Sequence, residues 1–229
     1  MPETARLVEI DFFRGIAILL MVIFHTIFDL SFFYGWSLNY LDGFWYYQGK
    51  SSAILFMLLS GTSSILSRNS VRRGLTVFSI GLLITLVSYV YSPDMYIRFG
   101  ILHLLGIGML TAPLFSRYSA LLLIVIGTLT IAIGNEFSYL TAPTAYLVPF
   151  GIKPPNFTSL DYYPLFPWLG LVIYGMAAGR LLYADRQPLW PSAASYRPIC
   201  WLSSLGRQSL LVYLVHQPII LTFLYIVNP

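Results

Sequence analysis

The sequence has few charged residues: Asp, Glu, Lys and Arg make up 10% of its 229 residues, whereas hydrophobic residues make up 57%. A soluble domain carries about 25% charged residues. Several apolar runs are long enough to cross the ~30 Å hydrocarbon core of a bilayer. The shortage of charge therefore predicts an integral membrane protein. The net charge of +4 then gives no reason to expect nucleic acid as a partner.

Cysteine and lysine are also scarce. The single cysteine, Cys200, excludes an intrachain disulfide and any multi-cysteine metal site. The only lysines, Lys50 and Lys153, lie outside the apolar runs, which excludes a retinal protein because its Schiff base needs a lysine within a span. The three histidines do not have the spacing of a metal motif such as HExxH, and we expect no metal.

The apolar runs predict an all-α, polytopic membrane bundle of about seven transmembrane helices, forming one domain over 1–229. A further apolar stretch, 140–152, is broken by Pro143 and Pro149 and is short for a span. It indicates a surface-lying or re-entrant segment. The seven predicted spans fall near 10–31, 51–67, 72–91, 98–115, 118–134, 163–183 and 205–227.

Basic residues between the spans predict the orientation. Cytoplasmic loops carry an excess of Lys and Arg, and an N-inside, C-outside arrangement places nine of them inside against three outside. The inner set is Arg6, Arg68, Arg72, Arg73, Arg117, Arg180, Arg186, Arg197 and Arg207, and the outer set is Lys50, Arg98 and Lys153. Aromatic clusters at 32–36, 44–47 and 161–168 fit an outer interfacial belt.

The first span carries four ionisable side chains in DFFRGIAILLMVIFHTIFDL, residues 11–30. Helical rotation places Arg14 within ~20° of His25 and ~16 Å from it along the axis, with Asp11 and Asp29 within ~40° of the same face. Ionisable residues inside a membrane usually face a bundle interior or an aqueous cavity, and they are functional candidates.

The four ionisable side chains on this face form a polar stripe, and each of them could also have a structural role. Asp11 and Arg14 could form an ion pair at the inner boundary, and His25 could be a hydrogen-bonded core histidine. Asp29, four residues after His25, could orient its imidazole or could lie in water at the outer boundary.

The other two histidines, His103 and His216, also fall in predicted spans. Tyr213 and His216 share a helix face, and Pro218 predicts a kink beside them. Either histidine could have a purely structural role. Gly175 and Gly179 form a small-xxx-small pattern, which is typical of helix packing.

Several segments in order resemble the heparan-alpha-glucosaminide N-acetyltransferase catalytic-domain family of membrane acyltransferases. They are RLVEIDFFRGIA (6–17), FMLLSGTSSILSR (56–68), RFGILHLLGIG (98–108), DYYPLFPWLG (161–170) and GRQSLLVYLVHQPI (206–219). The wider superfamily places ten residues between an Arg and a His in the first helix, and Arg14 and His25 match that spacing.

The resemblance implies transfer of an acetyl group from cytoplasmic acetyl-CoA, the co-substrate, to a sugar or glycolipid acceptor across the membrane. We expect His25 to be the general base, Asp29 to orient it, and His216 and His103 to assist at the catalytic site. The expected donor-binding residues are Arg14, Asp11, Arg98 and Tyr213, with the Tyr213 hydroxyl or His103 as candidates to stabilise the oxyanion.

The alternative function is a small-solute transporter or lipid flippase that uses the polar stripe of the first helix as its pathway. An odd number of spans without internal repeats argues against it. We expect a multi-pass protein of a prokaryotic cytoplasmic membrane, in contact with membrane lipid. Whether it forms a homo-oligomer is open.

Overall fold

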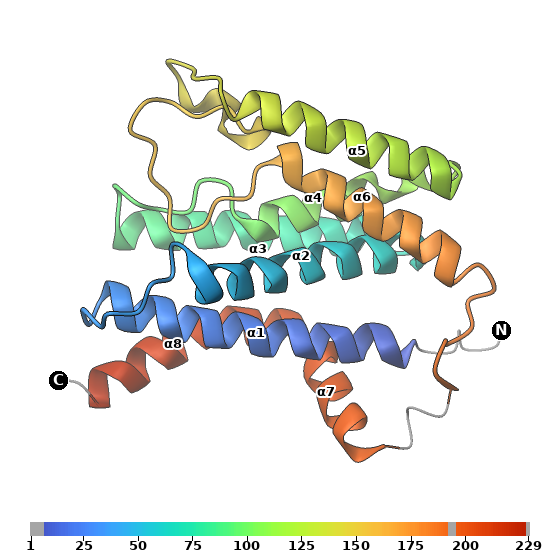
Figure 1. Ribbon diagram of the computed structural model, residues 1–229, viewed down its shortest axis with the longest axis horizontal. Helices are drawn as coiled ribbons and strands as arrows, with labels where there is room; N and C mark the ends of the chain where they lie inside the picture. The colour runs from blue at the N-terminus through green and yellow to red at the C-terminus, as the bar shows by residue number, and fades with distance from the viewer. Residues whose placement is uncertain (1–6, 192–195, 228–229) are drawn as a thin grey trace. The chain divides into compact units, whose positions relative to one another are not determined.

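A computed structural model describes residues 7–191 and 196–227, and most of these residues are helical (Figure 1). Within these residues the only strand-like pairings are two isolated bridges, Phe99 with Tyr162 and Thr141 with Lys153. The helices are α1 (Val8–Phe32), α2 (Gly43–Leu66), α3 (Ser70–Tyr91), α4 (Ile101–Phe115), α5 (Ala120–Phe137), the 3₁₀ helix η1 (Ala145–Phe150), α6 (Leu165–Leu182), α7 (Arg197–Arg207) and α8 (Ser209–Val227).

Five of these helices, α1, α3, α5, α6 and α8, are long and apolar enough to cross a membrane. The all-helical membrane class is therefore confirmed. Each of the seven predicted spans contains a helix, but α4 has only 15 residues and extends ~22 Å. The stretch 140–152 contains only η1, six residues long, which at ~2 Å per residue cannot span the bilayer.

The described residues fall into two compact units. Unit 1 combines the two ends of the chain, up to Phe56 and from Arg186 onward, and unit 2 runs from Met57 to Asp185. Helix α2 begins in unit 1 and ends in unit 2. In unit 1, α1 packs against α7 and α8 (Figure 1).

Two glycines allow α1 and α7 to cross closely. A Cβ at Gly15 would overlap the backbone of Leu202, and one at Gly206 would overlap the carbonyl oxygen of Asp11. Because backbone atoms cannot move aside as a flexible side chain can, only glycine fits at either position. This crossing anchors α7 beside Asp11 and Arg14.

Helix α7 is not among the predicted elements, and the last predicted span begins at 205. The structure ends α7 at Arg207 and starts α8 at Ser209. Pro198 lies in the first turn of α7, a position that proline tolerates. Its packed residues, Ile199, Leu202, Ser203 and Gly206, have a helical spacing that could have revealed it.

In unit 2, the last half of α2 packs against α6 through small residues. A Cβ at Gly175 would overlap the backbone of Leu58, and one at Gly179 would press on Thr62 and Ile65. The Thr62 hydroxyl also donates to the Gly175 carbonyl at 2.8 Å. The packing role predicted for Gly175 and Gly179 is therefore confirmed.

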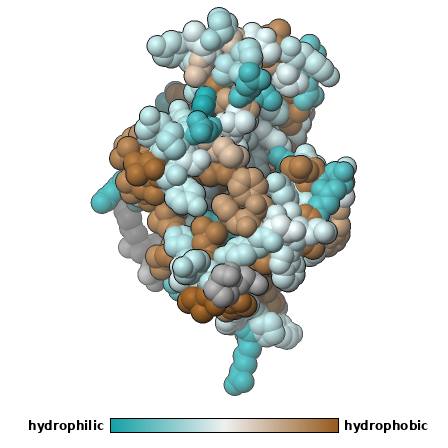
Figure 2. All heavy atoms as spheres, turned by 90° about the vertical axis from the view of Figure 1, so that its left-hand side faces the viewer, coloured by the Kyte–Doolittle hydropathy of each residue, from teal (hydrophilic) through white to brown (hydrophobic). Residues whose placement is uncertain are grey.

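Apolar side chains remain exposed on the helices, as lipid contact requires. Helix α3 presents Leu82, Leu83, Leu86, Val87 and Val90, each more than half exposed. On the face drawn in Figure 2, strongly hydrophilic residues are a minority among apolar and weakly polar ones. A soluble protein rarely exposes apolar surface of this extent.

Candidate active site

Two histidines from opposite ends of the sequence meet in unit 1. The imidazole rings of His25 on α1 and His216 on α8 have centroids 4.7 Å apart and an interplanar angle of 72°. His216 is buried, whereas His25 is half-buried. Both residues are among the predicted catalytic residues, but the sequence alone does not show that they are neighbours.

The hydrogen bonds of the two rings fix their tautomers. His25 Nδ1 lies 2.9 Å from the Met21 carbonyl oxygen, and His216 Nδ1 lies 2.6 Å from the Tyr213 carbonyl oxygen. A carbonyl oxygen only accepts, so each Nδ1 carries a proton and donates it. In the neutral rings each Nε2 is therefore a proton acceptor. His216 Nε2 is buried without a hydrogen-bond partner.

A second polar pair lies one helical turn along α1. Gln217 Nε2 lies 2.7 Å from Asp29 Oδ1 and 2.9 Å from Oδ2, and Asp29 is fully buried. We expected Asp29 to orient His25, but the Met21 carbonyl holds the His25 Nδ1. The partner of Asp29 is an amide that the sequence analysis did not single out.

The third histidine, His103, lies in unit 2 with both ring nitrogens hydrogen-bonded. Its Nδ1 accepts from the Gly100 N–H at 3.2 Å, so Nε2 carries the proton and donates to the Thr85 hydroxyl at 3.3 Å. Thr85 in turn donates to the Ile97 carbonyl at 2.7 Å. These bonds tie the loop before α4 to α3, and they leave no imidazole lone pair for a substrate. We therefore do not include His103 in the proposed site.

Asp11 and Arg14 lie close together near the start of α1. Arg14 Nη1 is 3.6 Å from Asp11 Oδ1, with 22% of the arginine side chain exposed and 9% of the carboxylate side chain exposed. The guanidinium is partly exposed, and a guanidinium is the side-chain group best suited to contact a phosphate. Their neighbour in the sequence motif, Arg6, lies outside the described residues.

Of the two remaining predicted donor-binding residues, Tyr213 belongs to unit 1. Its ring contacts that of His216, with centroids 5.5 Å apart. Arg98 lies in unit 2, stacked over the rings of Tyr96 at 4.8 Å and Phe157 at 5.2 Å, with a buried Nε that has no partner. Unit 1 therefore unites His25, His216, Asp29 and Tyr213.

Among the described residues, no group of three or more His, Cys, Asp or Glu side chains could hold a metal ion. The polar side chains of the His25–His216 site are instead those that acid–base chemistry requires. They offer two basic nitrogens, fixed in orientation by helix carbonyls, with a buried carboxylate one turn away.

Comparison with known proteins gives one match. The family model described as "Heparan-alpha-glucosaminide N-acetyltransferase, catalytic" matches residues 6–218, which is nearly the whole chain and includes every residue of the site. No curated protein matches. No solved structure matches either.

Proposed function

Because this chain belongs to the heparan-alpha-glucosaminide N-acetyltransferase catalytic-domain family of membrane enzymes, we propose that it transfers an acetyl or related acyl group from acyl-CoA to a hydroxyl or amino group of a sugar or lipid-linked acceptor. The proposed catalytic centre is the His25–His216 pair. The proposal thus covers the acyl-CoA donor, the sugar or lipid-linked acceptor, and the catalytic roles of the two histidines.

The observation that supports the proposal best is the common orientation of the two imidazoles. Both Nδ1 atoms donate to carbonyls of their own helices, which leaves both Nε2 lone pairs available as bases. A general base must be unprotonated and must reach the proton that it removes. His25 meets the second requirement better, because it is half-buried whereas His216 is closed off.

In the proposed step, the acceptor oxygen or nitrogen attacks the thioester carbonyl carbon while His25 Nε2 takes the proton of the acceptor. The new C–O or C–N bond forms, the C–S bond breaks, and the imidazolium returns the proton to the leaving sulfur. His216 Nε2, a basic nitrogen beside His25, stabilises the imidazolium. This resembles the role of the third residue in a catalytic triad.

The donor would bind near the start of α1, where Arg14 offers its guanidinium to the phosphates of coenzyme A. Along the helix, Arg14 and His25 are ~16 Å apart, comparable with the ~15–20 Å reach of an extended pantetheine arm. One face of α1 would thus hold both ends of the donor. Asp11 keeps the guanidinium in place, at 3.6 Å.

We further propose that α2 and α4 also cross the membrane, giving seven spans with the N-terminus inside. The donor would then enter from the cytoplasm of a prokaryotic cell. The basic residues of the connecting segments support this arrangement.

The proposed function is tested by measuring acyl transfer directly. Purified protein in detergent or nanodiscs is incubated with labelled acetyl-CoA and a panel of amino sugars and lipid-linked sugars, and labelled products are separated by chromatography. Product that depends on acceptor supports the proposal. Transport of an unmodified solute into proteoliposomes, with no acyl transfer to any acceptor, would favour the transporter alternative.

A further inference from the structure

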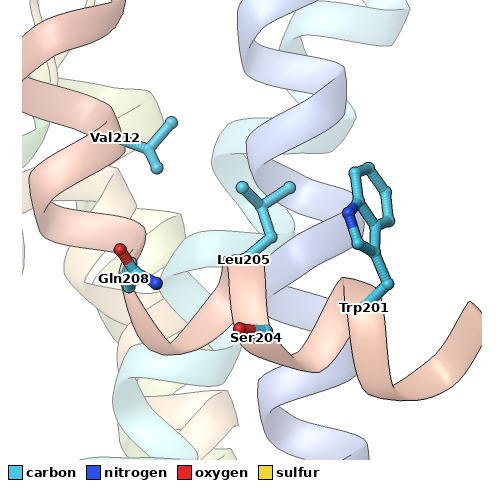
Figure 3. Close-up of a pocket in the computed structure, with 5 residues that line it drawn as sticks. All are labelled: Trp201, Ser204, Leu205, Gln208 and Val212. Atoms are coloured by element: carbon cyan, nitrogen blue, oxygen red, sulfur yellow. The ribbon is translucent and has the colours of Figure 1, made fainter. Parts of the chain in front are cut away.

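A pocket lies where α7 turns into α8, one helical turn before His216. It has a volume of about 210 Å³ and is lined by Trp201, Ser204, Leu205, Gln208 and Val212 (Figure 3). Four of these residues come from α7 and its C-terminal end, and Val212 comes from the first turn of α8. The lining combines an indole ring and two aliphatic side chains with a hydroxyl and an amide.

The pocket lies on the outward face of an amphipathic helix. The inward face of α7, which includes Ser203 and Gly206, packs on α1, whereas Trp201 is 62% exposed. Arg197 lies one turn before Trp201 and Arg207 directly precedes Gln208, and both arginines are exposed. At ~100° per residue, Arg197 lies ~40° from Trp201 on this face, whereas Arg207 lies ~120° from Trp201, at the edge of the face and next to Gln208 in the chain.

The position of this face along the chain places it at a membrane boundary. Helix α7 has 11 residues and extends ~16 Å, too short to cross a bilayer. Helix α8, which begins two residues after Arg207, is long and apolar enough to cross. Short amphipathic helices with Trp on one face and basic residues beside it lie in the interfacial plane of a membrane.

We propose that the α7–α8 pocket binds the headgroup of an acidic phospholipid. Ser204 and Gln208 would contact the phosphate, while Arg207, which precedes Gln208, and Arg197, at the other end of α7, add positive charge beside the pocket. The upper part of an acyl chain would pack on Trp201, Leu205 and Val212. Basic pockets at the ends of membrane helices are suited to anionic headgroups in this way.

The charge of the surrounding residues favours an anionic lipid headgroup in this pocket. From Arg186 to Gln208, the described residues include three arginines and no Asp or Glu, so an anion is attracted to this region. The pocket also offers an apolar wall that opens beside a helix able to lie in lipid. A phosphate with an attached hydrocarbon chain matches both features. This proposal does not depend on the acyl-transfer function.

Cys200 provides a reporter because it is the only cysteine, is exposed, and precedes Trp201. The full-length protein is labelled at Cys200 with an environment-sensitive fluorophore and reconstituted into phosphatidylcholine nanodiscs with increasing fractions of phosphatidylglycerol. We expect a saturable change in emission. The Arg197→Gln/Arg207→Gln double variant should need about 30-fold more phosphatidylglycerol for the same change.

The control is Arg72→Gln/Arg73→Gln, which removes two exposed arginines at the start of α3 and should leave the titration unchanged. Thermal unfolding of each variant checks the fold. An equal loss in the control would reduce the effect to general surface charge and overturn the site. So would no response to phosphatidylglycerol, or a response only to added 3′,5′-adenosine bisphosphate, which would assign the pocket to a nucleotide.

Discussion

The amide of Gln217 holds the buried carboxylate of Asp29, with Nε2 2.7 Å from Oδ1 and 2.9 Å from Oδ2. The amide orientation is fixed, because the opposite flip would place Oε1 against the carboxylate. His216 precedes Gln217 in the chain, and His25 lies one turn before Asp29. The Asp29–Gln217 pair is therefore placed to set the register of α1 and α8 at which the two imidazoles meet.

Exchanging the carboxylate and the amide between positions 29 and 217 tests whether this pair matters. Gln217→Glu should bring two carboxylates together, lower stability by about 1–3 kcal/mol and reduce turnover. The double variant Asp29→Asn/Gln217→Glu restores an amide facing a carboxylate and should recover both properties. Thermal unfolding and kcat are measured together. Failure of the double variant to improve on Gln217→Glu would contradict a role for the pair itself.

Substituted-cysteine labelling tests the proposed orientation. After replacement of Cys200 by serine, single cysteines at positions 40 and 155 should react with an impermeant reagent from outside, and those at the exposed positions 69 and 190 only after the membrane is permeabilised. The reason is the excess of basic residues in the proposed inner segments. Labelling of position 69 in intact cells would reverse the orientation, and with it the side from which the donor enters.

Arg14 can be tested through donor affinity. Loss of a guanidinium that contacts a phosphate removes about 1.5–3 kcal/mol, so Arg14→Ala should bind acetyl-CoA roughly 10- to 100-fold more weakly in a calorimetric titration. Arg14→Lys should retain part of the affinity, since it keeps the charge but not the bidentate geometry. The exposed Arg117→Ala is the charge-matched control. Equal affinity of Arg14→Ala and wild type would contradict a role for Arg14 in donor binding.

His103 should behave as a structural residue. His103→Ala removes a ring whose two nitrogens hold Gly100 and Thr85, and we expect a loss of about 1–3 kcal/mol in the free energy of unfolding. The folded fraction should keep most of its turnover. Thr85→Val, which breaks the same chain of bonds at the hydroxyl, should lower stability in the same direction. A stable His103→Ala variant without turnover would return His103 to the catalytic site.

Much of this arrangement is predictable from local patterns. Apolar runs of span length locate the long helices. In lipid every backbone N–H and C=O must be hydrogen-bonded within the protein, and a helix achieves this within one segment. The same reasoning did not locate α7, because its two arginines and two serines give it a low mean hydropathy. It also placed His25 correctly on the inward stripe of α1, since that depends only on helical rotation.

The pairings across the fold were not predictable. Residues 25 and 216 are separated by most of the chain, and no spacing rule shows that their helices are neighbours. Gln217 is uncharged and lies in an apolar run, so it carries no signal comparable to that of an intramembrane carboxylate. Asp29 was expected to serve its helical neighbour His25, but a partner on another helix holds it instead.

The most direct test of the account is the turnover of His25→Ala with labelled acetyl-CoA and an acceptor that the wild-type protein uses. If His25 is the general base, turnover should fall by roughly 10²–10⁴-fold, while acetyl-CoA affinity and thermal stability stay close to wild type. His216→Ala should lose less, because it supports the imidazolium and does not contact the acceptor. A well-folded His25→Ala protein that transfers acyl groups at close to the wild-type rate would contradict the assignment.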